Sequence, residues 1–133
     1  MKKRLEALER IERLQKQMHD LEVWRLAALD RERRELTEDH RAMLAAIGGV
    51  GVAAYGPPAA AAMRHIRALE RRIAAAEAEH AAQTRRAIDQ GARAKLADRA
   101  RESVDARYRD QQRRKELAEL IERSLGASKS SPA

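Results

Sequence analysis

Hydrophobic side chains recur along residues 2–47 at spacings of three and four, which is the pattern of one helix face. Near the start of this stretch, the spacing predicts a first seam formed by Ala7, Ile11, Leu14, Met18 and Leu21. Farther on, it predicts a second seam formed by Leu26, Leu29, Arg33, Leu36, His40, Met43 and Ile47. The step from Met18 to Leu29 is eleven residues, so we expect a stutter in the helical repeat between the two seams.

A second helical pattern covers residues 59–125 and repeats at three, four and seven residues. The positions concerned are Ala62, Ile66, Leu69, Ile73 and Ala76, followed by Ala100, Val104, Gln111, Ala118, Ile121 and Leu125. Between them, residues 74–103 hold only Ile88 and Leu96 as large apolar side chains, and they include Gly91. Because an interior glycine costs a helix about 1 kcal/mol relative to alanine, we expect this stretch to fray, bend or await a partner.

Turn signals separate the two patterns at residues 48–58, where four of the six glycines and two of the three prolines fall. A cluster of glycine and proline residues of this kind typically ends one helix and precedes another. The Ser-rich end, residues 126–133, is expected to be disordered. The sequence therefore predicts an all-α protein in which two long helices, residues 2–47 and 59–125, form an antiparallel coiled-coil hairpin.

Pairing the two helices around the loop brings Ile47 near Ala59 and His40 near His65. The second helix then overhangs the first over residues 105–125, and this overhang carries an apolar stripe that no helix of the same chain is left to cover. The stripe consists of Leu117, Leu120, Ile121 and Leu125. Such a stripe is a candidate docking surface for another protein; homodimerisation, or a bend that buries the stripe locally, would also account for it.

Alanine supplies most of the apolar content, since 28 of the 133 residues are Ala and only 2% are aromatic. Charged residues make up 37%, against about 25% in an ordinary domain. Layers of alanine bury little area, so the hairpin is expected to be marginally stable alone. The composition excludes a β-rich domain and most compact enzyme folds, and the absence of cysteine excludes a disulfide scaffold.

The formal net charge of +7 is concentrated in one segment. Residues 1–47 hold 11 basic and 10 acidic side chains, whereas residues 81–115 hold 11 basic and 5 acidic. A positive rod attracts nucleic acid, acidic lipid or an acidic protein surface; the alternative is a solvated helix with partial i, i+4 pairing. Without aromatic residues for base stacking, a helix-turn-helix or a zinc finger, specific DNA recognition is not expected. The alternative function is therefore a coiled-coil scaffold or dimer that binds nucleic acid or anionic surfaces through residues 81–115.

Few side chains suggest catalytic or metal chemistry. His40 and His65, facing each other, could bind a metal, but a polar layer in the seam is the simpler interpretation. The glycines of residues 48–51 lack the Lys and Ser or Thr that follow in a P-loop. We expect no enzymatic activity and no cofactor. No window approaches the about 20 apolar residues of a membrane span, and no secretory signal is present, so a cytoplasmic protein is expected.

The end of the second helix resembles the charged, Gln-containing signature of the FliJ-type proteins of flagellar export and of their YscO-type relatives in virulence type III secretion. The matching residues run from Tyr108 to Leu125 and read YRDQQRRKELAELIERSL. A second local likeness, HIRALERRI, spans His65 to Ile73 just after the loop. The order of a basic first helix, a short break and a longer second helix is also similar.

This resemblance implies a small cytoplasmic stalk, similar to the antiparallel coiled coil of a rotary ATPase γ subunit and associated peripherally with the inner-membrane export apparatus. It implies docking to the hexameric export ATPase through the paired terminal regions, contact with the export-gate membrane protein nearer the loop, and interaction with export chaperones. The ATPase-docking residues implied by position are Lys2, Arg4, Leu5, Leu8, Arg113, Lys115, Leu117, Ile121 and Leu125. The implied gate contact is the neighbourhood of His40, Met43, His65 and Leu69.

Overall fold

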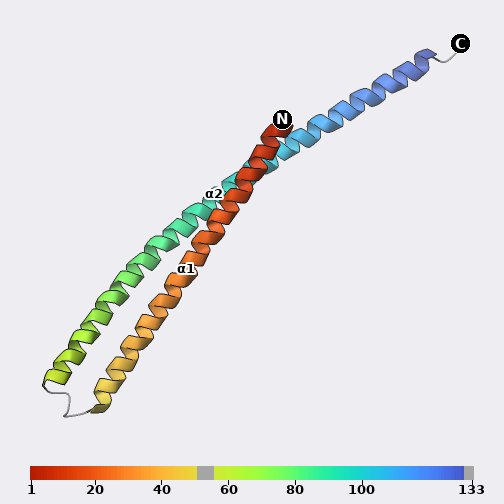
Figure 1. Ribbon diagram of the computed structural model, residues 1–133. Coiled ribbons are helices and arrows are strands. Elements are labelled where there is room, and N and C mark those ends of the chain that lie inside the picture. The colour runs from red at the N-terminus through yellow and green to blue at the C-terminus, as the bar shows by residue number, and fades with distance from the viewer. Residues whose placement is uncertain (51–55, 131–133) are drawn as a thin grey trace. The chain divides into compact units, whose positions relative to one another are not determined.

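The structure, a computed structural model, describes residues 1–50 and 56–130. It contains two α-helices, α1 (Lys2–Val50) and α2 (Pro57–Ser130), which pack against each other as a helical hairpin (Figure 1). The prediction of an all-α protein built from two long helices that fold back on each other is therefore confirmed.

Backbone geometry at Gly56 sets the start of α2. Its φ of 111° lies in the left-handed region, which glycine adopts without the steric cost that a side chain would add. The carbonyl oxygen of Gly56 accepts a hydrogen bond from the backbone N–H of Ala60 at 3.0 Å, which closes the first turn. Pro57 and Pro58 occupy this turn, where an N–H group would have no partner within the helix.

Both helices are longer than the sequence predicts, which corrects the expected loop (48–58) and the expected disordered tail (126–133). α1 continues to Val50 and α2 continues to Ser130, each through glycines of a predicted break. An interior glycine costs a helix only about 1 kcal/mol, which is too little to end the helix without a further signal. α2 also begins at Pro57, two residues before its predicted start, and residues 51–55 and 131–133 lie outside the described residues.

Contacts within the chain divide it into two units. The terminal unit comprises Met1–Gln17 and Ala92–Ala133, and the loop unit comprises Met18–Gly91. Each unit thus combines one stretch of α1 with one stretch of α2. The loop unit holds a buried apolar cluster, which consists of Leu36, Leu69 and Ala76 with Ile73 packed against them.

The buried side of α1 follows one uninterrupted repeat of three and four residues, which we call the inner seam. Its members are buried or half-buried: Leu5, Leu8, Glu12, Gln15, His19, Glu22, Leu26, Leu29, Arg33, Leu36, His40, Met43 and Ile47. The second predicted seam is part of this repeat and is confirmed. The first predicted seam and the stutter are wrong, because Ile11, Leu14, Met18 and Leu21 are all more than 40% exposed. Polar residues continue the repeat there, and apolar periodicity does not detect them.

A matching repeat runs along α2 and forms the other half of the inner seam. Its buried or half-buried members are Ala59, Ala62, Ile66, Leu69, Ile73, Ala76, His80, Gln83, Ala87, Gln90, Ala94, Ala97, Arg101, Val104 and Tyr108. Of the predicted positions, Ala62, Ile66, Leu69, Ile73, Ala76 and Val104 lie on this repeat, whereas Ala100, Gln111, Ala118, Ile121 and Leu125 are exposed. Residues 74–103, which we expect to fray, bend or await a partner, form uninterrupted helix, because alanine, which has the highest helix propensity, is frequent there.

Candidate functional site

The end of α2, in the terminal unit, carries an exposed apolar stripe that we call the overhang stripe. Its members are Leu117 (59% exposed), Leu120 (62%), Ile121 (51%) and Leu125 (56%). Every described side chain from Arg113 onward is exposed, and Gln112 is the last that is half-buried. Figure 1 shows this end of α2, in blue, continuing beyond the start of α1. The uncovered segment therefore begins at Arg113 and not at Asp105 as predicted, because Asp105 and Tyr108 are still half-buried.

The residues that the resemblance implies for ATPase docking all lie in the terminal unit, but they differ in access. Outside the overhang stripe, the exposed members are Lys2, Arg4, Arg113 and Lys115. Leu5, by contrast, is only 8% exposed, and Leu8 is half-buried. These two leucines belong to the inner seam, so they stabilise the hairpin and are not available to a partner.

The residues implied for export-gate contact lie in the loop unit, but they do not share one exposed surface. Leu69 is buried and Met43 is half-buried. His40 is half-buried, and its Nε2 lies 3.3 Å from Oε1 of Glu70. His65 is exposed. The predicted juxtaposition of His40 with His65 is therefore wrong: α1 runs past its predicted end, and the changed register places Glu70 beside His40.

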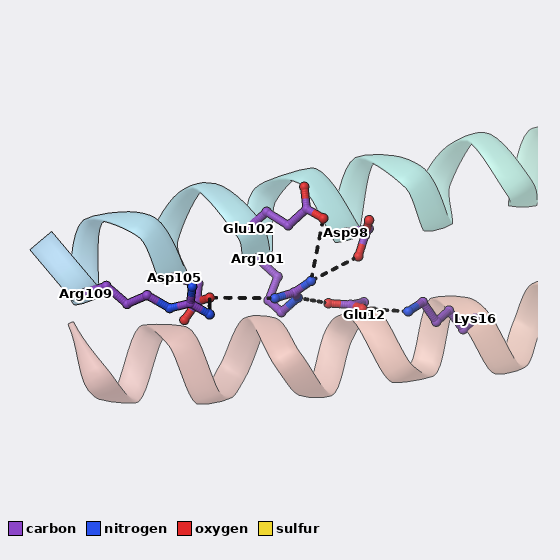
Figure 2. A network of polar contacts seen from close by, with 7 residues as sticks. All are labelled: Glu12, Lys16, Asp98, Arg101, Glu102, Asp105 and Arg109. Atoms are coloured by element: carbon purple, nitrogen blue, oxygen red, sulfur yellow. Dashed lines mark hydrogen bonds and ion pairs between the residues drawn. The ribbon is translucent and has the colours of Figure 1, made fainter.

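A network of charged side chains crosses the terminal unit at the inner seam (Figure 2). Glu12, which is 8% exposed, accepts a hydrogen bond from Nζ of Lys16 at 2.7 Å and another from Nε of Arg101 on α2. Carboxylates of α2 surround the same guanidinium: Asp98 at 3.3 Å, Glu102 at 3.8 Å and Asp105 at 4.0 Å. A charged layer therefore joins the two helices where the prediction expected an apolar one.

Hydrogen bonding sets the charge state of this layer. The hydrogen bond from Lys16 lowers the pKa of Glu12 below its ordinary value, and Arg101 lowers it further. In turn, the hydrogen bond to Glu12 raises the pKa of Arg101. Sequence analysis missed this pair because both members are charged. The sequence does contain a signal for Glu12. The seam from Leu26 to Ile47 reaches Glu12 when it is continued toward the N-terminus in alternate steps of four and three residues.

Polar side chains also occupy part of the inner seam in the loop unit. Gln83, which is 2% exposed, donates from Nε2 to the backbone carbonyl of Glu22 at 2.9 Å and also to its carboxylate. Its Oε1 accepts a hydrogen bond from Arg86 at 3.0 Å. Nearby, a Cβ added at Gly91 would stand 3.1 Å from Cε1 of His19. The glycine therefore makes room for the imidazole, a role that the sequence did not reveal.

The basic segment 81–115 is only partly neutralised by its neighbours. Four of its arginines have hydrogen-bond or ion-pair partners: Arg86, Arg101, Arg109 and Arg114. Within the described residues, the other basic side chains have none: Arg85, Arg93, Lys95, Arg99, Arg107, Arg113 and Lys115. The segment therefore presents unpaired positive charge both before and after Arg101 in the sequence.

In the described ranges, no cluster of three or more His, Cys, Asp or Glu side chains could hold a metal ion. The two helices, as far as they are described, include no stretch that is long and apolar enough to cross a membrane. Comparison with protein-family models, with curated proteins and with solved structures found no match. The similarity to FliJ-type and YscO-type proteins therefore stays a prediction from two stretches of sequence.

Proposed function

We propose that the chain is an accessory stalk of a flagellar or type III protein-export apparatus, and that it docks the end of α2 on the hexameric export ATPase. One observation carries this proposal. The overhang stripe is 51–62% exposed, on a helical segment where every described side chain from Arg113 onward is exposed. Contiguous exposed apolar surface marks sites of protein interaction, and an amphipathic helix binds by laying its apolar face in a groove.

The terminal unit anchors the part of α2 that precedes the overhang, because α1 packs against it there. Leu5 and Val104 are buried in the inner seam, and Glu12 is hydrogen-bonded to Arg101 across it. A helix that is anchored before it meets a partner loses less conformational entropy on binding, so more of the contact energy appears as affinity.

Charge supports the same assignment. The uncovered segment opens with three consecutive basic residues, Arg113 to Lys115, directly before the overhang stripe. Clustered basic charge accelerates the approach to an acidic surface, which an export ATPase would have to offer around its docking groove. In this proposal Lys2 and Arg4 add to the basic end, while Leu5 and Leu8 hold the hairpin together.

Further contacts follow from the same stalk role. We assign contact with the export-gate membrane protein to the loop unit, in the neighbourhood of His40, Met43, His65 and Leu69. His65 is exposed there, His40 and Met43 are half-buried, and Leu69 is buried. The stalk would lie in the cytoplasm, associated peripherally with the inner-membrane apparatus, and would also meet export chaperones. It acts through binding and carries out no reaction of its own.

Affinity between the purified chain and the purified hexameric export ATPase tests this function. Leu117→Ala combined with Ile121→Ala is expected to weaken binding at least about a hundredfold, because each buried methylene contributes roughly 0.8 kcal/mol. Val23→Ala combined with Ile88→Ala is the matched control. These side chains are 45% and 65% exposed and lie outside the overhang, so the affinity should not change.

Two results would contradict the proposal. If the unaltered chain does not bind the ATPase even at low salt, the stalk function is wrong. If the control pair weakens binding as much as the overhang pair, the overhang stripe is not the site. Failure to bind the ATPase together with DNA affinity that falls steeply with salt would favour the alternative function through residues 81–115.

A further inference from the structure

Beyond Leu5 and Leu8, which face α2, the α1 stretch of the terminal unit exposes its large apolar side chains and turns polar ones toward α2. Glu12 is 8% exposed and Gln15 is half-buried, both on the inner seam. Ile11 and Leu14, by contrast, are 46% and 54% exposed. Together with Ala7, which is half-buried, they form a second run at spacings of four and three, which we call the outer seam. Since a helix normally buries its apolar stripe against a neighbour, the outer seam is a surface without its neighbour.

Helix geometry keeps the two seams apart. At 3.6 residues per turn, each residue advances about 100°, which places the outer seam roughly 110° around α1 from the inner seam. α2 therefore cannot cover both seams at once. A second neighbour of α1 on the outer seam would lie beside the hairpin, within reach of long side chains that project from α2.

The charged network marks one side of the helix pair, and the outer seam lies on the other. Lys16, Asp98 and Asp105 each follow an inner-seam position by four residues, and all three belong to the network (Figure 2). Ile11 and, on α2, Arg107 instead directly precede inner-seam positions. In an antiparallel pair, equivalent positions of the two repeats fall on the same side, so Ile11 and Arg107 share the side opposite the network.

The outer-seam side of the terminal unit is strongly basic. Six exposed arginines occupy or flank it: Arg4, Arg10, Arg93, Arg99, Arg107 and Arg113. None of the six has an ion-pair partner within the part of the chain that the structure describes. The carboxylate that the repeat does place on this side, Asp110, lies 3.2 Å from Arg114 and is already paired. A ligand for this side must therefore bring its own negative charge.

The shape of the outer seam favours a helix over a lipid surface as the ligand. Ala7, Ile11 and Leu14 span roughly 60° of the helix circumference, the width of a coiled-coil seam, whereas an apolar face that enters a bilayer or a globular core is about 100° wide or more. We propose that the outer seam binds a helix of a partner protein, with apolar side chains at spacings of three and four and carboxylates at the flanking positions. Arg10 and Arg107 pair with those carboxylates, which fixes orientation and speeds association, while the apolar seam supplies most of the affinity.

The outer seam is separate from the overhang stripe. It lies on α1, within the paired part of the terminal unit, and it requires no export ATPase. The apolar residues of the two sites do not overlap, although Arg4 and Arg113 flank the outer seam and are also assigned to ATPase docking. Substitution of the apolar residues at one site therefore tests that site independently of the other.

A designed peptide tests the inference directly. The probe is a helix of about four heptads with Leu at both seam positions and Glu at the flanking positions. A second peptide replaces each flanking Glu by Lys. Fluorescence anisotropy with the full chain should show binding of the Glu peptide, and binding of the Lys peptide at least about tenfold weaker, because like charges then face the arginines.

Two double variants locate the site. Ile11→Gln combined with Leu14→Gln should weaken binding of the Glu peptide about a hundredfold and leave the far-UV circular dichroism unchanged, because both side chains are exposed. Leu117→Gln combined with Ile121→Gln is the matched control in the overhang stripe. It should leave the affinity of the Glu peptide unchanged.

Several results would overturn the inference. Equal affinities for the two peptides would show that the arginines do not pair with carboxylates of the partner helix. Loss of binding in the overhang variant alone would show that the peptide binds the overhang stripe and not the outer seam. If sedimentation shows a dimer of the unaltered chain that Ile11→Gln with Leu14→Gln dissociates, the occupant is a second copy. If the same variant abolishes binding to phosphatidylserine–phosphatidylcholine vesicles, the occupant is a membrane.

Discussion

The inner seam is apolar in most of the loop unit and polar in the middle of the terminal unit. In the loop unit it buries a cluster of large and small apolar side chains, namely Leu36, Leu69, Ala76 and Ile73. In the terminal unit the corresponding layer is Glu12 hydrogen-bonded to Arg101, while Ile11 and Leu14 are exposed. The comparison teaches that the middle of the terminal unit replaces apolar packing between its helices by a charged layer and keeps apolar surface outside, where a partner can reach it.

The two kinds of layer stabilise the hairpin differently. Burial of a leucine side chain contributes roughly 1.5–3 kcal/mol. A charged layer must first overcome the desolvation of both groups, and it favours folding only when its hydrogen bonds are well formed. We therefore expect the loop unit to dominate the free energy of unfolding and the terminal unit to open first.

The largest expected effect comes from the apolar cluster. Leu36→Ala should lower the free energy of unfolding by about 2–5 kcal/mol, because it leaves a cavity where the side chain was 5% exposed. Urea unfolding followed by circular dichroism measures the change. Leu44→Ala, at a position 48% exposed on the same helix, should change it by less than about 0.5 kcal/mol. Equal effects at the two positions would contradict the assignment of the inner seam.

The charged layer should respond differently to single and double substitution. Arg101→Leu leaves Glu12 without its partner on α2 and should lower the urea midpoint, by less than Leu36→Ala does. Glu12→Leu combined with Arg101→Leu should restore the midpoint or raise it above that of the unaltered chain, because an apolar pair needs no charge compensation. If the double variant is less stable than the unaltered chain, the charged layer contributes more than an apolar layer in its place, and the prediction is wrong.

Stability should also depend on pH through Glu12. Its pKa in the folded chain is lowered from 4.5, chiefly by the hydrogen bond from Lys16. The contribution of Glu12 to the free energy of unfolding is therefore complete at pH values above its pKa in the unfolded chain. This contribution is lost as the pH falls through its lower pKa in the folded chain. The difference in free energy of unfolding between the unaltered chain and Glu12→Gln should be constant near neutral pH and shrink below a pH of 4.5. Urea titrations across this range measure it; a difference that grows on acidification would contradict the sign.

The smallest expected effect is that of Gly91→Ala on the melting temperature, in which a gain in helix propensity opposes a loss in packing. Gly91→Ala gains about 1 kcal/mol of helix propensity, but the new Cβ would stand 3.1 Å from Cε1 of His19. We expect the two effects nearly to cancel in the melting temperature. In the background of His19→Ala the same substitution should raise the melting temperature, because the close contact is gone. An equal change in both backgrounds would show that the glycine makes no room for the imidazole.

The sequence predicts the fold and the loop-unit seam because both depend on signals that are local and apolar. The glycines and prolines of residues 48–58 place the break, and Leu29, Leu36 and Met43 repeat at seven. The exposure of the overhang stripe was also predictable, since one helix is longer than the other. The exact helix ends were not predictable from the sequence, because glycine weakens a helix without ending it.

The terminal-unit seam could not be predicted from apolar periodicity. Ile11 and Leu14 form the more regular apolar run, yet they lie outside, while Glu12 lies inside. Nothing local shows that Glu12 will meet Arg101, which is 89 residues away in sequence; the register of the hairpin decides it. Charged inner-seam residues are visible in the sequence only when the repeat is extended from the loop unit, where it is unambiguous.

Cysteine labelling tests the central claim, the orientation of α1 in the terminal unit, most directly. The natural chain has no cysteine, so Leu5→Cys, Leu8→Cys, Ile11→Cys and Leu14→Cys each introduce a single thiol. We predict fast reaction with a maleimide reagent at positions 11 and 14, and slow reaction at positions 5 and 8. Fast reaction at positions 5 and 8, with protection at positions 11 and 14, would show that the outer seam and not the inner seam faces α2, and would contradict the account.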